Sequence, residues 1–258
     1  MKTDAAQLEK EAHLCLTENN HEQAFKLFKN AALIHKQNNN HKHSALCYAS
    51  AASCWSKKSE EKTFFNAASA YEMAAYEANL SEDFEYASML YKYAAINYER
   101  DGEYYYYSDC FYQSKESYRN FLTYRFLMPD KIHPIAEPDG HSGIKGFVRL
   151  FFTWAALTFS YLIWGHGERP LRTFFTSLFI IFASAFFYMS SNLFAGGVVF
   201  MPRFFQALYF SVVTFTTVGY GDIVPVGISK AVVMIEVFSG LFVMPLFVVG
   251  LTRKYLRL

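Results

Sequence analysis

Residues 202–225 read PRFFQALYFSVVTFTTVGYGDIVP, and they say more about this chain than any other stretch. Pro202 suits the first turn of a helix, where its missing N–H leaves no hydrogen bond unmade. The helix expected over about 203–215 is too short to cross a bilayer. It runs directly into residues 217–221, where Gly219 and Gly221 permit backbone conformations that other residues rarely adopt. The stretch therefore predicts a short helix that ends in a specialised loop.

Two long apolar segments lie on either side of this stretch. Residues 173–202 contain no charged residue and predict an outer span over about 172–194, while residues 231–252 contain only Glu236 and predict an inner span over about 230–252. The outer ends of both spans are basic, which favours the cytosolic side of a membrane. These basic residues are Arg169, Arg172, Arg253, Lys254 and Arg257. The short helix and its loop should then enter the membrane from the opposite face.

Residues 207–225 resemble the pore domain of potassium channels with two transmembrane segments, with TVGYG at 217–221 as the family's selectivity filter. The resemblance implies a tetramer in which backbone carbonyls replace the hydration shell of K⁺. These carbonyls would come from Thr217, Val218, Gly219 and Tyr220, with Gly221 completing the filter and Thr216 and Asp222 supporting it. Val213 stands where some bacterial members carry a carboxylate, so inactivation behaviour does not transfer. Apart from K⁺, no cofactor or metal is expected.

Three residues of the inner span are candidates for further roles. Gly240 lies close to the family's gating hinge and Pro245 follows it, so the pair predicts either a gating kink or a static packing accommodation. Glu236 is an acid at membrane depth and should face protein or water. It is expected to accept a hydrogen bond from the short helix, with attraction of cations into a cavity as the alternative.

The N-terminal half has a different composition. Residues 1–142 carry 15 Lys and Arg against 20 Asp and Glu, whereas residues 143–258 carry 9 against 3. This asymmetry predicts a soluble domain followed by a membrane domain. The start of the chain shows no signal sequence, and the four cysteines (Cys15, Cys47, Cys54 and Cys110) show no close metal-ligand spacing. They are expected to be buried free thiols in a reducing compartment, and His41 and His43 to lie in a solvated loop.

Small and apolar residues recur at helical spacing over residues 1–126 and predict six helices, arranged as three stacked hairpins. Stretches such as residues 22–28, 65–71 and 91–95 resemble tetratricopeptide repeats, especially the long-helix variant of soluble NSF attachment proteins. That resemblance implies a surface for a protein or peptide partner, and no nucleic acid is expected. The tyrosine run 104–107 should either pack or line such a surface.

Prolines in residues 127–142 predict a linker, and residues 143–170 form a pre-pore segment. Its apolar part, residues 147–164, is a borderline span. A third span would place the N-terminal domain outside the cell. Its lack of a signal sequence and its unpaired cysteines argue against export, so an interfacial or protein-buried helix is favoured. It should turn at residues 165–170, which resemble a turn preceding the pore in some bacterial channel proteins. No Arg-rich helix suggests voltage sensing.

The predicted fold class is all-α: a helical-hairpin solenoid followed by a two-span pore domain over residues 171–258. The predicted function is a potassium-selective channel subunit in a homotetramer, conducting passively, embedded in the lipid of the cell membrane and modulated by a cytosolic N-terminal domain. A membrane-tethered scaffold and a non-selective cation channel are the alternatives. No catalytic constellation is present in the sequence, so an enzyme is not expected.

Overall fold

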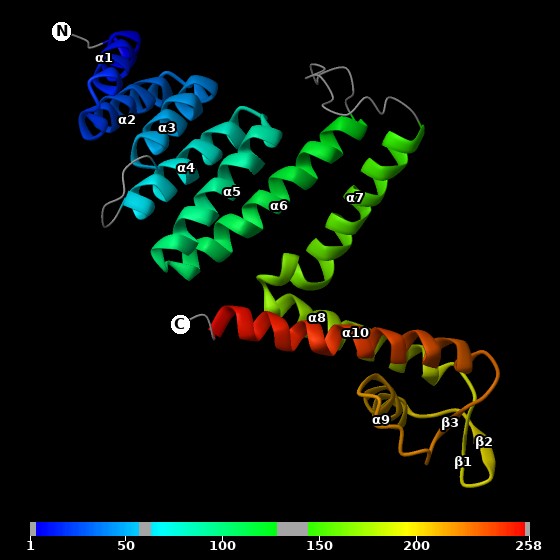
Figure 1. The fold of residues 1–258 in the computed structure, drawn as a ribbon. Helices are drawn as coiled ribbons and strands as arrows, with labels where there is room; N and C mark the ends of the chain where they lie inside the picture. The colour runs from blue at the N-terminus through cyan, green and yellow to red at the C-terminus, as the bar shows by residue number, and fades with distance from the viewer. Residues whose placement is uncertain (1–3, 57–62, 128–143, 256–258) are drawn as a thin grey trace. The chain divides into compact units, whose positions relative to one another are not determined.

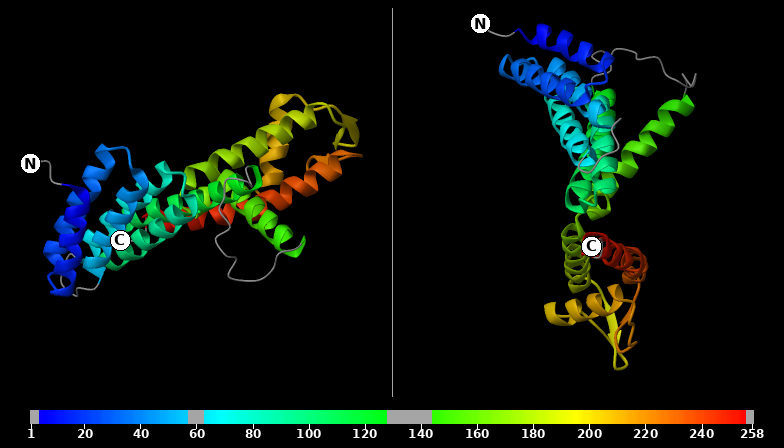
Figure 2. Two further views of the ribbon diagram at one scale, coloured as in Figure 1. Left: turned by 90° about the horizontal axis from the view of Figure 1, so that it is seen from above. Right: turned by 60° about the vertical axis from the view of Figure 1, so that its left-hand side comes forward.

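The computed structural model describes residues 4–56, 63–127 and 144–255 and is mostly helical, as predicted. The chain divides between Phe159 and Ser160 into two compact units. In the first unit six helices stack side by side in chain order (Figures 1 and 2), each packed on the next. They are α1 (Ala5–Thr17), α2 (His21–Gln37), α3 (His41–Ser56), α4 (Thr63–Leu80), α5 (Phe84–Asp101) and α6 (Tyr104–Leu127). The predicted linker over 127–142 begins at Leu127, the last residue of α6, and its other residues lie outside the described part of the chain.

The corners between helices use a recurring device. A residue with positive φ ends one helix, and an Asn or Asp caps the next. Asn19 (φ 58°) precedes Asn20, whose side chain accepts a hydrogen bond from the Gln23 N–H, and Glu82 (φ 60°) precedes Asp83, which caps α5 in the same way. Such caps satisfy backbone N–H groups that the first helical turn leaves without partners. These polar breaks therefore set where the hairpins turn.

Alanine dominates the contacts between the stacked helices. Ten alanines from α2 to α4 are completely buried, and their small side chains let neighbouring helix axes approach closely. They are Ala24, Ala31, Ala32, Ala51, Ala52, Ala67, Ala68, Ala74, Ala75 and Ala78. The cysteines are free, with Cys47, Cys54 and Cys110 buried and Cys15 half-buried. In the tyrosine run, Tyr106 stacks on Tyr98 while Tyr105 is exposed, so its members divide between packing and surface.

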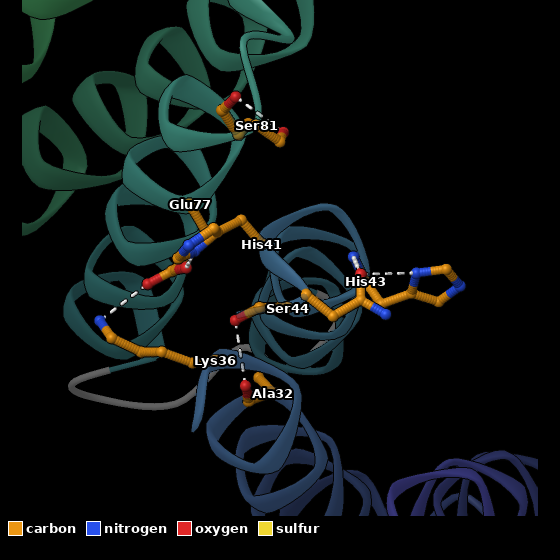
Figure 3. A network of polar contacts seen from close by, with 9 residues as sticks. Ala32, Lys36, His41, His43, Ser44, Glu77 and Ser81 are labelled. Carbon is orange, nitrogen blue, oxygen red and sulfur yellow. Dashed lines mark hydrogen bonds and ion pairs between the residues drawn. The ribbon is translucent and has the colours of Figure 1, made fainter. Parts of the chain in front are cut away.

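An acid lies inside this stack. Glu77 of α4 is buried; its Oε1 lies 2.7 Å from Lys36 Nζ and its Oε2 lies 2.8 Å from His41 Nδ1 (Figure 3). The prediction that His41 lies in a solvated loop is wrong, because α3 begins there and this imidazole partners Glu77. The hydrogen bond to Glu77 raises the pKa of Lys36. Its stabilising effect is therefore present at neutral pH and is lost only as the pH rises through that elevated pKa.

Lys36→Met should destabilise the helical stack. Of the two ion-pair partners of the buried Glu77 carboxylate shown in Figure 3, only His41 would remain. We expect the free energy of local opening to fall by about 1–3 kcal/mol. Hydrogen–deuterium exchange of α2–α4 amides measures this opening. Lys26→Met is the control: its ion pair with Glu22 is exposed, so its effect should stay within about 0.5 kcal/mol. Equal effects of the two substitutions would contradict the role of Glu77.

Three helices of the described chain are long and apolar enough to cross a membrane: residues 146–167, 170–189 and 229–255. The first belongs to α7 (Ile144–Trp164) and the short 3₁₀ helix η2 (Gly165–Gly167) that follows it. None of the apolar window of α7 is buried within the single chain. A helix over 147–164 is thus present, and the chain itself does not bury its apolar window. Its favoured placement, interfacial or buried in protein rather than across the membrane, stays a prediction.

The second unit contains the other two candidate spans, α8 (Pro170–Met189) and α10 (Ser229–Tyr255), which lie side by side (Figures 1 and 2). The short helix α9 (Phe204–Phe215) packs against both. Helix α8 ends five residues before the expected end of the outer span. After α8 the chain instead enters a three-stranded antiparallel sheet, which was not predicted from the sequence. Its strands are β1 (Leu193–Ala195), β2 (Val198–Phe200) and β3 (Val224–Pro225), in the order β2-β1-β3.

Candidate functional site

The short helix α9 is fixed at both ends. At its start the Arg203 N–H donates to Gln206 Oε1 at 3.0 Å, which satisfies a backbone donor at the helix terminus. Along its length Ala207 and Phe210 are buried in a core with residues of α8 and β1. That core contains Ala185, Tyr188 and Leu193. Helix α9 is therefore held as a rigid support for the loop that follows it.

The loop after α9 has an alternating backbone. Thr217 (φ 57°), Gly219 (φ 55°) and Gly221 (φ 76°) have positive φ, whereas Val218 and Tyr220, which lie between them, do not. Positive φ costs glycine little, but for β-branched Thr217 it is a strained conformation that must be held by its surroundings. Three backbone hydrogen bonds anchor the strained segment to α9. The Thr217 N–H donates to Thr214 O at 3.0 Å, and the N–H groups of Val218 and Gly219 both donate to Val213 O, at 3.1 and 3.4 Å.

The predicted filter residues 217–221 are all exposed in the single chain. Val218 is 52% exposed and Tyr220 71% exposed, which is unusual for apolar side chains in a segment so firmly anchored. Non-helical backbone at membrane depth requires cover by protein or a water-filled cavity. If the loop lies at membrane depth, other chains or a water-filled cavity would have to cover it.

The far side of the loop is tied back to the short helix. Tyr209 of α9 donates a hydrogen bond from its hydroxyl to Asp222 Oδ2 at 2.8 Å, just after the glycine at 221. Thr216 donates from Oγ1 to the Val212 carbonyl at 2.7 Å, which is a contact within α9 itself. Sequence reasoning selected Thr216 and Asp222 but missed Tyr209. Its only signal was a hydroxyl on a mostly apolar helix, a signal that Ser211 and Thr214 share.

Glu236 joins three helices. Its carboxylate is buried in α10 and accepts hydrogen bonds from Ser211 of α9 and from the Tyr188 hydroxyl of α8, the latter at 2.7 Å. The Ser211 hydroxyl oxygen also lies 2.8 Å from the Ile181 carbonyl oxygen of α8, a second acceptor for its single hydrogen. Glu236 therefore has the expected partner on the short helix and does not face open solvent in the single chain. Tyr188 and Ser211 were not singled out from the sequence.

Helix α10 is continuous through Gly240 and Pro245. Gly240 is buried, and a Cβ atom added there would lie 2.0 Å from the carbonyl oxygen of Phe215, the last residue of α9. The absence of a side chain thus lets α10 approach the base of the strained loop. This close approach fits the second of the two roles considered for Gly240, a static packing accommodation rather than a gating kink. A hinge at Gly240 and Pro245 stays a prediction.

The other end of α10 meets the turn before α8. A Cβ atom at Gly250 would lie 3.4 Å from Pro170 Cβ, an ordinary contact distance. Arg253 NH1 lies 3.9 Å from the buried Glu168 carboxylate in the turn. In the first turn of α8, next to this turn, the Arg172 guanidinium lies 4.4 Å from the Tyr161 ring centroid and donates to the Tyr161 carbonyl at 3.0 Å. The turn therefore contacts both the end of α7 and the end of α10.

The second unit also matches a known family. Residues 174–257 match the sequence model of the family Ion_trans_2, described as "Ion channel", and this match does not extend to the helical stack. No curated protein and no solved structure matches the chain significantly. The matched residues contain most of α8, the sheet, α9, the strained loop and α10. Together with the apolar helices, the match shows that the C-terminal part of this multi-pass membrane protein is an ion channel domain and not an enzyme.

Proposed function

We propose that the chain is a subunit of a potassium-selective channel that conducts passively through residues 217–221. The alternating sign of φ at Thr217, Gly219 and Gly221 is the observation that carries the proposal. In an ordinary strand successive carbonyls point to opposite sides, whereas alternation between left- and right-handed conformations favours carbonyls on one side. A row of carbonyl oxygens on one side is what replaces the hydration shell of K⁺ in a filter. Thr217, Val218, Gly219 and Tyr220 would supply these oxygens.

The proposal requires four chains. One strand of carbonyls can cover only one side of an ion, and channels of the matched family typically assemble as tetramers. The exposure of residues 217–221 in the single chain supports a symmetric assembly in which these segments face a common axis. We therefore propose a homotetramer in which Asp222, held by Tyr209, and Glu236, held by Ser211 and Tyr188, fix the filter from behind.

We further propose that the helical stack modulates the gate from the cytosol. The basic residues Arg169, Arg172, Arg253 and Lys254 favour the cytosolic side for the outer ends of α8 and α10. A cytosolic stack further requires that α7 does not cross the membrane, because a third span would place the stack on the opposite side. The contacts of the 165–170 turn with α10, through Gly250 and Arg253, offer a route from α7 to the gate. A peptide or protein partner of the stack would act through this turn. The resemblance of the stack to tetratricopeptide repeats stays a prediction.

Ion flux from liposomes that contain the purified full chain tests the proposal. We expect K⁺ efflux that Ba²⁺ blocks, with Na⁺ efflux at least ten times slower, because the carbonyl spacing suits K⁺. Equal K⁺ and Na⁺ fluxes would instead indicate a non-selective cation channel. A stable tetramer without flux would be retested after deletion of residues 1–138. Flux released by the deletion would identify the stack as an inhibitory gate, and continued absence would favour the scaffold.

A further inference from the structure

We propose that Glu9, His35 and Cys47 form a transition-metal site in the helical stack, suited to Zn²⁺. The three residues come from α1, α2 and α3, one from each helix. Each offers one candidate ligand atom, and these atoms all lie within 4.8 Å of one another. The residues are separated by 26 and 12 positions in the chain, so the sequence shows no metal-binding motif. Folding of the first three helices brings them together.

The set of donor atoms points to zinc. A thiolate, an imidazole and a carboxylate together suit Zn²⁺, whereas Mg²⁺ and Ca²⁺ prefer oxygen ligands alone. With three protein ligands, a tetrahedral zinc keeps its fourth position for water or another small ligand. Coordination converts the Cys47 thiol into a thiolate and releases its proton to solvent. The thiolate and the Glu9 carboxylate then balance the two positive charges of the metal.

Zinc binding requires the three donor atoms, which lie within 4.8 Å of one another, to move to the spacing of zinc ligands. His35 Nε2 and Glu9 Oε1 lie 2.7 Å apart in a hydrogen bond. Two ligands of a tetrahedral zinc at the usual bond lengths lie about 3.3 Å apart. The Glu9 side chain is 32% exposed and the His35 side chain 16% exposed, so both can rotate to open this gap. Cys47 is only 4% exposed and packs with the core of the stack, which holds its sulfur in place.

The partial exposure of Glu9 and His35 also gives the metal access to the site from solvent. Glu9 and His35 form the solvent side of the site, and Cys47 forms its floor. A bound ion would cross-link α1, α2 and α3 and so stabilise the N-terminal end of the stack. The site lies within the first unit, and the proposal does not depend on the proposed ion selectivity.

Cobalt binding to the full chain tests the site. The protein is solubilised in detergent, stripped with a chelator and titrated with Co²⁺, whose bond to a thiolate gives an absorption band in the near ultraviolet. We expect one Co²⁺ per chain with this band, and complete displacement of Co²⁺ by Zn²⁺. Cys47→Ser should remove the band, and Glu9→Gln and His35→Gln should each weaken Zn²⁺ binding at least tenfold. Glu9 is partly exposed, so Glu9→Gln should leave the stack folded. This variant therefore still tests the site if Cys47→Ser unfolds the stack.

Cys54→Ser is the matched control. Cys54 is a buried cysteine on the same helix α3. Its thiol donates a hydrogen bond to the Ser50 carbonyl oxygen at 3.2 Å, and it is not one of the three candidate metal ligands. This variant should keep both the band and the affinity. The proposal is overturned if the full chain binds no Co²⁺, or binds it without a thiolate band. It is equally overturned if Glu9→Gln and His35→Gln bind Zn²⁺ as tightly as the Cys54→Ser protein.

Discussion

Gly219→Ala should abolish selective K⁺ flux, whereas Gly196→Ala should leave it intact. The two glycines are closely matched: Gly219 has φ 55° and Gly196 has φ 56°, and a Cβ atom at either position would meet no other atom within 4 Å in the single chain. An alanine therefore pays the same backbone cost at both, about 1–2 kcal/mol. The two positions differ in their surroundings: Gly219 lies in the proposed filter, whereas Gly196 lies in a turn outside it.

In the proposed tetramer four copies of Gly219 lie in one filter, so the cost of holding its conformation rises to about 4–8 kcal/mol. A penalty of this size strongly depopulates the arrangement in which all carbonyls face the ion. Gly196 lies in the β1–β2 turn, outside the filter, where each chain can relax alone. Liposome flux of K⁺ and Na⁺ compares the two variants. Unchanged selectivity in Gly219→Ala would remove residues 217–221 as the filter.

Much of the fold could be predicted because its signals are local. The six helices of the stack follow from the spacing of apolar residues, and their corners follow from Asn, Asp and Gly at the breaks. The short helix between two spans likewise follows from Pro202 and the lengths of the uncharged segments. What the sequence could not show is pairing between distant positions. Strand β3 pairs with β1 across about thirty residues, and both strands are too short to leave a periodic pattern.

The same limit applies to the sites. Glu236 could be selected because an acid is rare at membrane depth, but nothing local identified Tyr188 as its second partner, 48 residues away. Cys47 was expected to be an inert buried thiol, because spacing along the chain does not reveal a carboxylate and an imidazole on two other helices. Isolated hydroxyl, acid and thiol groups in apolar helices become informative only once the helices are packed.

Gly240→Ala is expected to disrupt the pore, whereas Gly250→Ala should be tolerated. Both glycines are buried in α10, and in an isolated helix either substitution would be favourable by about 1 kcal/mol. A Cβ atom at Gly250 would find only ordinary contacts, the nearest at 3.4 Å. At Gly240 it would lie 2.0 Å from the Phe215 carbonyl oxygen, against about 3.3–3.6 Å for a comfortable carbon–oxygen contact.

The group that would have to move is backbone, and it lies two residues before the strained Thr217. Relief of the clash must therefore displace either α10 or the base of the filter, and in a tetramer it does so four times. We expect Gly240→Ala to lose K⁺ flux and to form less tetramer, measured by liposome flux and by size-exclusion chromatography. A hinge role alone gives a different result: normal tetramer and normal selectivity, with only the open probability of single channels changed. Helix α10 thus needs glycine at position 240 for the distance it must keep from α9, before any bending is considered.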